Sequence, residues 1–562
     1  MEILHIENLS FSYPNSDKKA LDNVTFSVNK GEFIVLCGKS GCGKSTLLKL
    51  LKKEISPYGT VNGEIKYNGT ALSETDDRTS VEEIGFVMQN PESGIVTDTV
   101  WHELAFTLEN LGVSTKIIRR KVAEMASFFG IEEWFHKKTS ELSGGQKQLL
   151  NLAAVMVANP KVLLLDEPTA QLDPISAANF IATLKKINRE LGLTVVLAEH
   201  RLEEVFPLAD KVLMLEGGKK EFFDNPKNIV SYFEKNPKND MRFAMPSAIR
   251  IFSRLEKNGA CPITVREGRQ YISSNYKNET KALKVKPYSH SEQKAVELKD
   301  VFFRYSRDLP DILKGISLEI YKGEHFCVLG GNGTGKTTTL KVICGILKAY
   351  KGKILINGKK ISDYKQNELY INNLSLLPQD PADLLLSKTV YEDLLESCNT
   401  MNFDKNTAKK RIEEVSQTLG IADLLNSHPY DLSGGEQQKA AIGKVLILNP
   451  QILLLDEPTK GIDACGKQTL AEIIKTLKQN GITVITVTHD IEFAALCADR
   501  VGLFFDGDLV SVDTVNNFFT QNSFYTTAAN RISRDYFENA VLCDDVVKLC
   551  LINGKKAVTN NE

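Results

Sequence analysis

A chain of 562 residues with 42% hydrophobic and 25% charged side chains has the composition of a core-forming globular protein, and its length allows two or three α/β domains. The formal net charge of −2 gives the chain as a whole no strong attraction to nucleic acid or anionic lipid. No apolar run reaches the roughly 20 residues of a membrane-spanning helix, and residues 1–13 lack the basic and apolar regions of a signal peptide. We therefore expect a chain that stays in the cytosol.

The ten cysteines have no CxxC spacing, so we expect reduced thiols rather than disulfides or a zinc site. Cys42 is the exception in its expected chemistry. It stands inside a glycine-rich loop, beside Lys44 and a predicted helix N-terminus. This position predicts a reactive thiol that a bulky alkylating reagent such as a maleimide would modify.

The first motif along the chain is a glycine-rich phosphate-binding loop, and it occurs twice. Residues 37–46 read CGKSGCGKST and residues 330–338 read GGNGTGKTT. Each loop follows a short apolar run and precedes a helix-patterned stretch, the context in which G-x-x-x-x-G-K-[ST] binds phosphate through backbone N–H groups. The expected phosphate ligands are Gly38, Ser40, Gly41, Gly43, Lys44, Ser45 and Thr46 in the first copy, and Gly330, Asn332, Gly333, Gly335, Lys336, Thr337 and Thr338 in the second.

A second repeated phrase is LSGG, at residues 142–145 and 432–435. Each LSGG leads into a helix-patterned stretch, so its glycines predict a helix N-terminus that is open to a phosphate. In the second copy a glutamate replaces a glutamine directly after the phrase, and we expect a modest asymmetry from this added carboxylate. The residues concerned are Ser143, Gly144, Gly145 and Gln146, and Ser433, Gly434, Gly435 and Glu436.

Two apolar runs that end in acid, residues 162–167 and 452–457, predict central parallel strands that deliver carboxylates to the C-terminal edge of a sheet. We expect the first carboxylate of each copy to hold Mg²⁺ with the loop hydroxyl, because a hard cation takes oxygen ligands, and the second to polarise a water. The Mg²⁺ ligands are Asp166 with Ser45 and Asp456 with Thr337, and the water-polarising catalytic residues are Glu167 and Glu457.

His200 and His489 each end a further apolar, strand-like run, so both are expected at the same sheet edge as catalytic residues. The other six histidines, such as His102 and His325, have no counterpart at the matching position in the other copy. We expect them to be structural.

The offset between the two copies stays between 289 and 292 residues for the loop lysines, the acidic strands and the strand-end histidines. One nucleotide-binding domain has therefore been duplicated and fused. We expect domains at residues 1–225 and 293–512, a linker at 226–292 and a C-terminal extension at 513–562.

The ordered set of phosphate loop, strand-following glutamine, LSGG, LLLDEP and strand-end histidine resembles the ATP-binding-cassette (ABC) ATPases over most of the chain. The resemblance implies an α/β fold of two tandem P-loop NTPase domains. Each would have a mostly parallel core sheet, an antiparallel β subdomain and a helical signature subdomain. It also implies that Gln89 and Gln379 contact Mg²⁺ and the bound nucleotide, and that Tyr13 and Tyr305 stack on the adenine of ATP.

In ABC ATPases the LSGG of one domain binds the ATP held by the other. The resemblance therefore implies two composite ATP sites, formed by domains that face head to tail. Site one would combine the phosphate loop, carboxylates and histidine of the first copy with Ser433 to Gly435, and site two would combine those of the second copy with Ser143 to Gly145.

Residues 87–112, 197–205 and 432–463 are similar to the fused ATPase subunits of energy-coupling-factor (ECF) importers, which take up vitamins or transition-metal ions. This resemblance implies a transmembrane coupling (T) protein and a membrane-embedded substrate-binding (S) protein on separate chains, with no nucleic acid partner. The chain would lie at the cytoplasmic face of the membrane. The pocket for the transported substrate would lie on another polypeptide.

The resemblance also implies a groove for a helix of the membrane partner, next to the helix-patterned stretches 99–106 and 389–396. Glu103 and Glu392 are the expected contacts there, and Thr389 precedes Glu392 at capping-box spacing. Charge reversal at either glutamate is expected to uncouple transport from ATP hydrolysis.

Two alternatives remain open. ABC-F translation factors use a long basic helical linker, and residues 226–290 carry 13 Lys and Arg against 5 Asp and Glu. Proline and glycine residues nevertheless interrupt any continuous helix there. Sugar-importer ATPases are also fused, but one of their two sites is typically degenerate, whereas both motif sets are intact here.

Within the linker, Ile249, Phe252 and Leu255 have the spacing of a short amphipathic helix. The polar composition of residues 273–294 predicts a flexible connector. The stretch from 515 onwards has an ambiguous pattern, and residues 554–562 are expected to be frayed.

Overall fold

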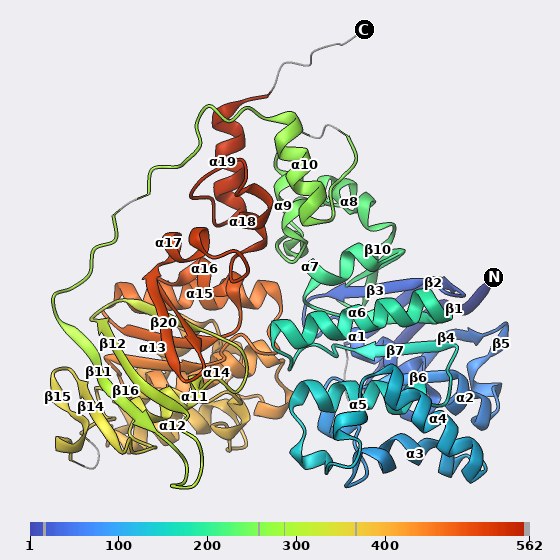
Figure 1. The fold of residues 1–562 in the computed structure, drawn as a ribbon, viewed down its shortest axis with the longest axis horizontal. Helices are drawn as coiled ribbons and strands as arrows, with labels where there is room; N and C mark the ends of the chain where they lie inside the picture. The colour runs from blue at the N-terminus through green and yellow to red at the C-terminus, as the bar shows by residue number, and fades with distance from the viewer. Residues whose placement is uncertain (15–17, 257–258, 286, 366–367, 556–562) are drawn as a thin grey trace. The chain divides into compact units, whose positions relative to one another are not determined.

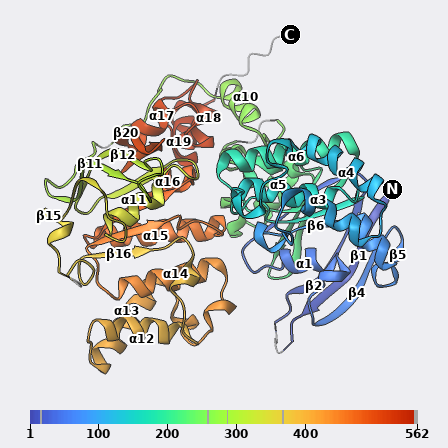
Figure 2. The ribbon, with the colours of Figure 1, turned by 60° about the horizontal axis from the view of Figure 1, so that its bottom comes forward.

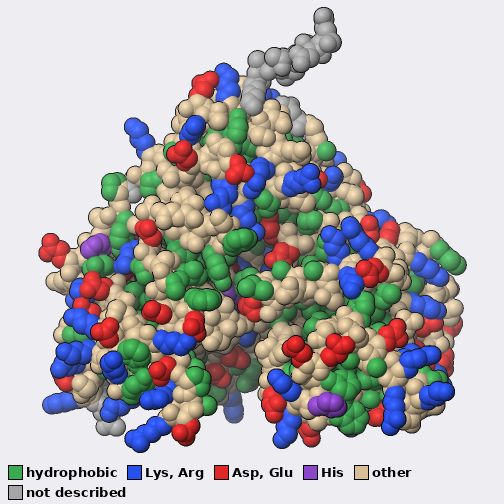
Figure 3. Space-filling model, viewed as in Figure 1, with side chains coloured by type: hydrophobic (Ala, Val, Ile, Leu, Met, Phe, Trp, Pro, Cys, Tyr) green, Lys and Arg blue, Asp and Glu red, His purple; other side chains and the backbone are tan. Residues whose placement is uncertain are grey.

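The computed structural model describes residues 1–14, 18–256, 259–285, 287–365 and 368–555 (Figure 1). The chain divides into two compact units, residues 1–249 with 259–264 and residues 250–258 with 265–562. None of the helices in the described ranges is long and apolar enough to span a membrane. On the face drawn in Figure 3, acidic and basic side chains are interspersed within each unit, in agreement with the net charge near zero.

The first unit is built on a six-stranded sheet of order β10-β9-β3-β8-β7-β6, in which only β10 runs antiparallel to its neighbour. The strands β3, β7 and β8 are buried at every residue, as expected for parallel strands covered on both faces. The strands are β3 (Phe33–Gly38), β6 (Ile84–Val87), β7 (Val162–Asp166), β8 (Thr194–Ala198), β9 (Lys211–Glu216) and β10 (Lys219–Asp224).

A four-stranded antiparallel sheet of order β2-β1-β4-β5 forms a second layer of this unit. Its strands are β1 (Glu2–Ser12), β2 (Leu21–Asn29), β4 (Thr60–Tyr67) and β5 (Thr70–Ala71). The helices are α1 (Lys44–Leu50), α2 (Asp77–Glu83), α3 (Val100–Asn110), α4 (Thr115–Phe128), α5 (Gly144–Met156), α6 (Pro174–Leu191), α7 (Leu202–Val205) and α8 (Ile229–Lys235).

The second unit repeats this topology, with sheet orders β16-β17-β18-β13-β19-β20 and β12-β11-β14-β15. Its core strands are β13 (His325–Leu329), β16 (Leu374–Leu377), β17 (Ile452–Asp456), β18 (Thr483–Thr488), β19 (Arg500–Phe505) and β20 (Asp508–Thr514). Its antiparallel sheet holds β11 (Lys294–Phe303), β12 (Leu313–Tyr321), β14 (Lys351–Ile356) and β15 (Lys359–Lys360). The helices of the repeated part are α11 (Lys336–Ile343), α12 (Val390–Thr400), α13 (Lys405–Leu419), α14 (Gly434–Leu446), α15 (Ala464–Gln479) and α16 (Ile491–Cys497).

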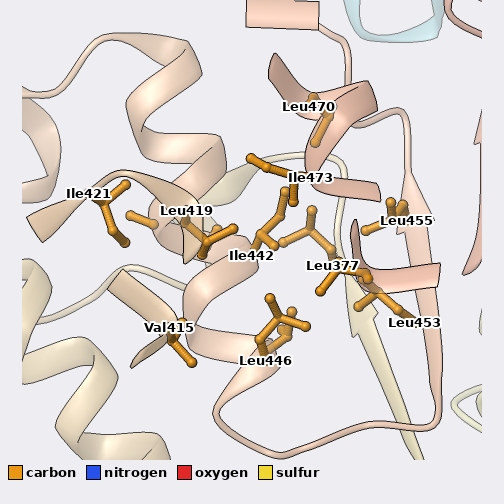
Figure 4. Packing of buried hydrophobic residues seen from close by; sticks show 14 of the residues in the cluster. Leu377, Val415, Leu419, Ile421, Ile442, Leu446, Leu453, Leu455, Leu470 and Ile473 are labelled. Carbon is orange, nitrogen blue, oxygen red and sulfur yellow. The ribbon is translucent and has the colours of Figure 1, made fainter. Parts of the chain in front are cut away.

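The predicted fold class is therefore confirmed: each unit combines a mostly parallel core sheet, an antiparallel sheet and a group of helices, which is seen for α12, α13 and α14 in Figure 2. In the second unit, Leu453 and Leu455 of β17 pack with Ile442 and Leu446 of α14 in one buried cluster (Figure 4). This packing joins the helix that follows LSGG to the strand that ends in the predicted magnesium ligand.

The linker is more structured than its composition predicted. The predicted amphipathic helix is confirmed for Ile249 and Phe252 as α9 (Ser247–Ser253), which ends before Leu255, and α10 (Val265–Asn275) follows it. Beyond α10, the prediction of a flexible connector is wrong for the first part. The side-chain amide of Asn553 donates to Thr280 O at 2.8 Å, and Thr280 N donates to Asn553 Oδ1 at 2.7 Å. Glu538 N donates to Lys281 O at 2.6 Å. The C-terminal extension thus provides hydrogen-bond partners for the backbone of Thr280 and Lys281 in the linker.

The C-terminal extension forms three helices, α17 (Val515–Gln521), α18 (Ala528–Ser533) and α19 (Cys543–Asn553), and α18 and α19 lie beside α10 (Figure 1). Phe518 and Phe519 pack with Cys327 and Leu329 of β13, which anchors the extension on the second sheet. Arg269 of α10 pairs with Asp535 at 2.7 Å. The ambiguous pattern after residue 515 therefore belongs to helices. Of the stretch predicted to be frayed, residues 556–562 lie outside the described residues.

His325 confirms the expectation of a structural histidine and gives the second unit an acid-sensitive core. It is fully buried at the start of β13, and its ring nitrogens lie 2.9 Å from Thr486 Oγ1 and 3.0 Å from Cys497 O. Burial lowers the pKa of His325 to about 4 from its usual 6.5. Phe33 stands at the matching position of β3.

Between pH 6.5 and about 4 the unfolded chain binds a proton at His325 that the folded chain does not, so stability falls as the pH falls through this window. The full contribution is about 3 kcal/mol. We expect His325→Phe, which copies the first unit, to reduce the loss of melting temperature between pH 7.5 and pH 5 in calorimetry. An unchanged pH dependence in this variant would contradict the assignment.

Candidate active site

Both phosphate loops are shaped by a glycine that no other residue replaces without strain. Gly43 and Gly335 precede α1 and α11 with φ of 104° and 113°, in the left-handed region. A Cβ on Gly43 would lie 2.5 Å from Ala20 O, and one on Gly335 would lie 3.1 Å from Ile312 O. The loop backbone can therefore turn tightly into the helix N-terminus, where N–H groups and the helix dipole favour an anion.

The loop lysines are buried and held by loop carbonyl groups. Lys44 Nζ donates to Gly38 O at 3.0 Å, and Lys336 Nζ donates to Gly330 O at 2.9 Å. This arrangement fixes the ammonium group over the loop. A positive charge is thus available beside the predicted phosphate position in each unit.

The predicted magnesium ligands lie together in both units. Ser45 Oγ donates to Asp166 Oδ1 at 2.8 Å, and Thr337 Oγ1 donates to Asp456 Oδ1 at 2.9 Å. Burial raises the pKa of both aspartates, and the hydroxyl hydrogen bonds offset only part of this effect. A bound cation would stabilise these buried carboxylates, so the oxygen donor sets fit Mg²⁺.

The glutamate that follows each magnesium ligand has an unusual backbone. Glu167 and Glu457 have φ of 45° and 46°, a left-handed conformation that is uncommon for a side chain of this size. Such strain persists where the surrounding structure fixes it, and it is enriched at active sites. Because both units have the same backbone deviation at this glutamate, we take it to be a property of the fold.

The carboxylate of Glu167 contacts several predicted site residues at once. Gln89 Nε2 donates to Glu167 Oε2 at 3.0 Å, and His200 Nε2 lies 2.8 Å from Oε1. Lys44 Nζ lies 3.7 Å from Oε1. Burial raises the pKa of Glu167, but the lowering effect of His200 and Lys44 is larger. The net pKa therefore lies below its usual value.

The second unit repeats this cluster, but not every contact is the same. Lys336 Nζ lies 3.7 Å from Glu457 Oε1, and His489 Nδ1 lies 3.0 Å from Oε2. The pKa of Glu457 is lowered overall, against the effect of burial, mainly by His489. Gln379 follows β16 as Gln89 follows β6, but within the described residues no hydrogen bond joins Gln379 to Glu457.

The predicted adenine-stacking tyrosines lie beside the phosphate loops. The Tyr13 hydroxyl is 3.0 Å from Thr46 Oγ1, and the Tyr305 hydroxyl is 3.2 Å from Thr338 Oγ1. Their side chains are 42% and 58% exposed. Both tyrosines are therefore partly exposed next to a phosphate loop, and stacking on adenine stays a prediction.

The LSGG phrases begin helices, as predicted: α5 and α14 start at Gly144 and Gly434, which are exposed. In the first copy Ser143 N donates to Gln146 Oε1 at 3.0 Å. In the second, Glu436 Oε2 accepts hydrogen bonds from Ser433 N at 2.9 Å and Ser433 Oγ at 2.6 Å. The carboxylate that distinguishes the second copy is thus engaged in capping its own helix.

Two predictions from the sequence are wrong. Glu103 is buried rather than exposed, and its Oε2 accepts hydrogen bonds from the N–H groups of Val96 at 3.0 Å and Thr97 at 2.7 Å. Its counterpart, 290 positions on, is the buried Asp393 and not Glu392, so the constant offset could have shown the correct pairing.

The prediction of a reactive thiol at Cys42 is the second that is wrong. Cys42 is also buried, at 5% exposure, and alkylation by a bulky reagent is not expected in the folded chain.

Comparison with known proteins decides the family. The model of the ABC transporter family matches residues 21–170 and 313–460. This chain belongs to the ABC transporter ATPase family. A Bacillus thuringiensis protein provisionally named an ABC transporter ATP-binding protein is 42% identical over 97% of this chain and 98% of its own length.

Two further ABC proteins are informative in their names. YkoD of Bacillus subtilis, provisionally assigned as an HMP/thiamine import ATP-binding protein, is 31% identical over 90% of this chain and 91% of its own length. The solved structure of CbiO1 from Clostridium perfringens, described as part of the ABC transporter complex CbiONQ, is 32% identical. It covers 41% of this chain and 92% of its own length, with a TM-score of 0.39.

Family membership makes this chain an ATP-binding transport ATPase with two cassettes in one polypeptide. The phosphate loops, acidic strands and LSGG phrases described above fall within the two matched segments.

Proposed function

We propose that this ABC ATPase is the energy-coupling subunit of an ECF-type importer for a vitamin or a transition-metal ion. The observation that carries the proposal is the completeness of both residue sets, each with a loop lysine, hydroxyl, aspartate, glutamate and histidine in matching contacts. The name of the relative YkoD, which refers to HMP/thiamine import, supports the substrate class. Two complete sites count against a sugar importer, in which one site is typically degenerate.

Each ATP would be bound by one cassette and contacted by the LSGG helix of the other. In site one, the loop N–H groups and Lys44 hold the β and γ phosphates, and Tyr13 stacks on adenine. Gly434 and Gly435 present the N-terminus of α14 to the same γ phosphate. Site two uses Lys336 and Tyr305 with the N-terminus of α5 in the same way.

Mg²⁺, when bound, would neutralise charge that develops on the β and γ phosphates. Ser45, Asp166 and Gln89 would hold it in site one, and Thr337, Asp456 and Gln379 in site two. All of these donors are oxygen atoms of the kind that a hard cation takes.

Hydrolysis transfers the γ-phosphoryl group to water, with the bond from the γ phosphorus to the bridging oxygen breaking as the bond to water forms. Glu167 accepts a hydrogen bond from the attacking water and orients it in line with the leaving ADP. His200 holds the Glu167 carboxylate from one side and Gln89 holds it from the other. Glu457 and His489 have the corresponding roles in site two.

A separate transmembrane T protein would dock beside α3 and α12, and an S protein would carry the substrate, with this chain at the cytoplasmic face. The loops before these helices expose apolar side chains: Val96 is 66% exposed and Leu386 is 76% exposed. Gln89 lies at the start of the first of these loops and contacts Glu167, so closure around ATP would move the docking surface.

We expect the tagged chain to fractionate with membranes only when the T protein is coexpressed. Val96→Asp and Leu386→Asp should reduce this association, because a charge replaces an apolar contact, while the ATPase rate of the isolated chain stays within about two-fold. Leu191→Asp, at an exposed position at the end of α6, is the matched control. Cosedimentation with ribosomes, independent of the T protein, would instead favour the ABC-F alternative.

A further inference from the structure

One buried carboxylate beside the first site has no counterpart in the second. Glu199 follows β8 directly before His200, and its side chain is 2% exposed. The matching position in the second copy is Thr488. The two cassettes therefore differ in the residue that precedes the catalytic histidine.

The carboxylate of Glu199 links two segments of the first site. Its Oε1 accepts hydrogen bonds from the hydroxyl of Thr169 and from Thr169 N, the latter at 3.2 Å. Its Oε2 accepts hydrogen bonds from His200 N at 2.8 Å and Arg201 N at 3.3 Å. Thr169 follows Glu167 by two residues, so Glu199 ties the segment that begins at Glu167 to the segment that carries His200.

The second copy makes this connection with neutral groups. Thr488 Oγ1 lies 3.5 Å from Thr459 Oγ1 and accepts a hydrogen bond from Asp490 N at 3.0 Å. The backbone N–H of His489 is left to donate to Glu457 Oε2 at 3.2 Å. In the first copy the equivalent N–H is taken by Glu199, so Glu167 and Glu457 have different sets of donors.

We propose that Glu199 is a positioning residue for hydrolysis at the first ATP site, and that its absence from the second copy makes the two sites turn over at different rates. The inference rests on the proposed roles of Glu167 and His200. Hydrogen bonds to a buried carboxylate are stronger than those between neutral groups. Glu199 therefore holds Glu167 and His200 in a fixed relative position, which Thr488 does only weakly in the second copy.

The test measures the first site alone, in the full chain with Glu457→Gln. Adding Glu199→Gln should lower kcat roughly 10- to 100-fold, because the amide cannot accept all four hydrogen bonds and a small displacement of reacting groups is costly. KM for ATP should change by less than about three-fold, since no contact to nucleotide is removed. Thr488→Val in the Glu167→Gln chain is the matched change, and it should alter kcat by less than about three-fold.

A second pair of variants tests the same link from the other side. Thr169→Val should lower kcat in the Glu457→Gln chain as Glu199→Gln does, and Thr169→Ser, which keeps the hydroxyl, should restore it. An unchanged kcat in Glu199→Gln would overturn the inference. So would a parallel loss of ATP affinity and melting temperature, which would make Glu199 only structural.

Hydrolysis by the Glu457→Gln parent chain tests the role of Glu167 separately from that of Glu199. Adding Glu167→Gln to the Glu457→Gln chain should abolish its remaining hydrolysis. If it does not, the proposed role of Glu167 is wrong and the inference falls with it. If the parent behaves as expected and only the Glu199 and Thr169 variants are silent, the catalytic assignment stands and the positioning role is rejected.

Discussion

Replacing Glu167 or Glu457 with glutamine is expected to slow hydrolysis at its own site by about 10²- to 10⁴-fold, the range for losing a general base. The amide keeps the shape of the side chain but does not accept a proton from the attacking water. Each carboxylate is buried, lies near the loop lysine and contacts the strand-end histidine. The phosphate loops are not altered, so ATP should still bind.

The measurement is single-turnover hydrolysis together with nucleotide retention on the purified chain. The double variant Glu167→Gln with Glu457→Gln should retain two ATP per chain without hydrolysing them. Glu190→Gln, an exposed position on α6, is the control and should behave as the parent. Hydrolysis at the parent rate in the double variant would show that the catalytic assignments are wrong.

Gly435→Asp is expected to have the second largest effect, and it should act on the site whose phosphate loop lies in the other cassette. A carboxylate at the N-terminus of α14 would repel the γ phosphate. It would also offset the positive potential that the helix dipole provides there. Loss of one such stabilising group costs about 10²- to 10³-fold in rate. Hydrolysis at the Lys44 site, measured in the Glu457→Gln chain, should fall by this amount.

Gly435→Ala is the control, because the structure has room for a methyl group at this glycine. A Cβ at Gly435 would lie 3.9 Å from Ile462 Cγ2, an ordinary contact, so Gly435→Ala should retain most of the activity. In the Glu167→Gln chain, Gly435→Asp should leave hydrolysis at the Lys336 site within about three-fold of its parent. A loss at the Lys336 site instead, with the Lys44 site unaffected, would contradict the head-to-tail arrangement.

Much of the fold and of the site could be predicted from sequence because the relevant interactions are local. The phosphate loops depend on glycines at fixed spacing, and the acidic strands depend on an apolar run that ends in Asp166 or Asp456. Their duplication at a constant offset made the order of the elements predictable as well. The structure confirms the fold class and brings Ser45, Asp166 and Glu167 of the first site together with His200.

Other features depend on contacts between distant segments, which periodicity does not encode. Thr280 is held by Asn553, 273 residues away, so a polar linker stretch became ordered against predictions from composition. Glu103 resembles an exposed helix residue in sequence, but it is buried because its carboxylate binds the backbone of the preceding loop. The hydrogen bonds of Glu199 could not be predicted for a similar reason, since its partner Thr169 lies on another segment of the chain.

The proposed function requires that this ATPase powers import through separate membrane chains. The most direct measurement is to purify the chain from detergent-solubilised membranes with its bound partners, release the small molecules and identify them by mass spectrometry. We expect a T protein and a small S protein in the complex, with a vitamin or a transition-metal ion bound in about one-to-one ratio to the S protein. Recovery of ribosomal RNA and ribosomal proteins, without a membrane partner or bound solute, would contradict it.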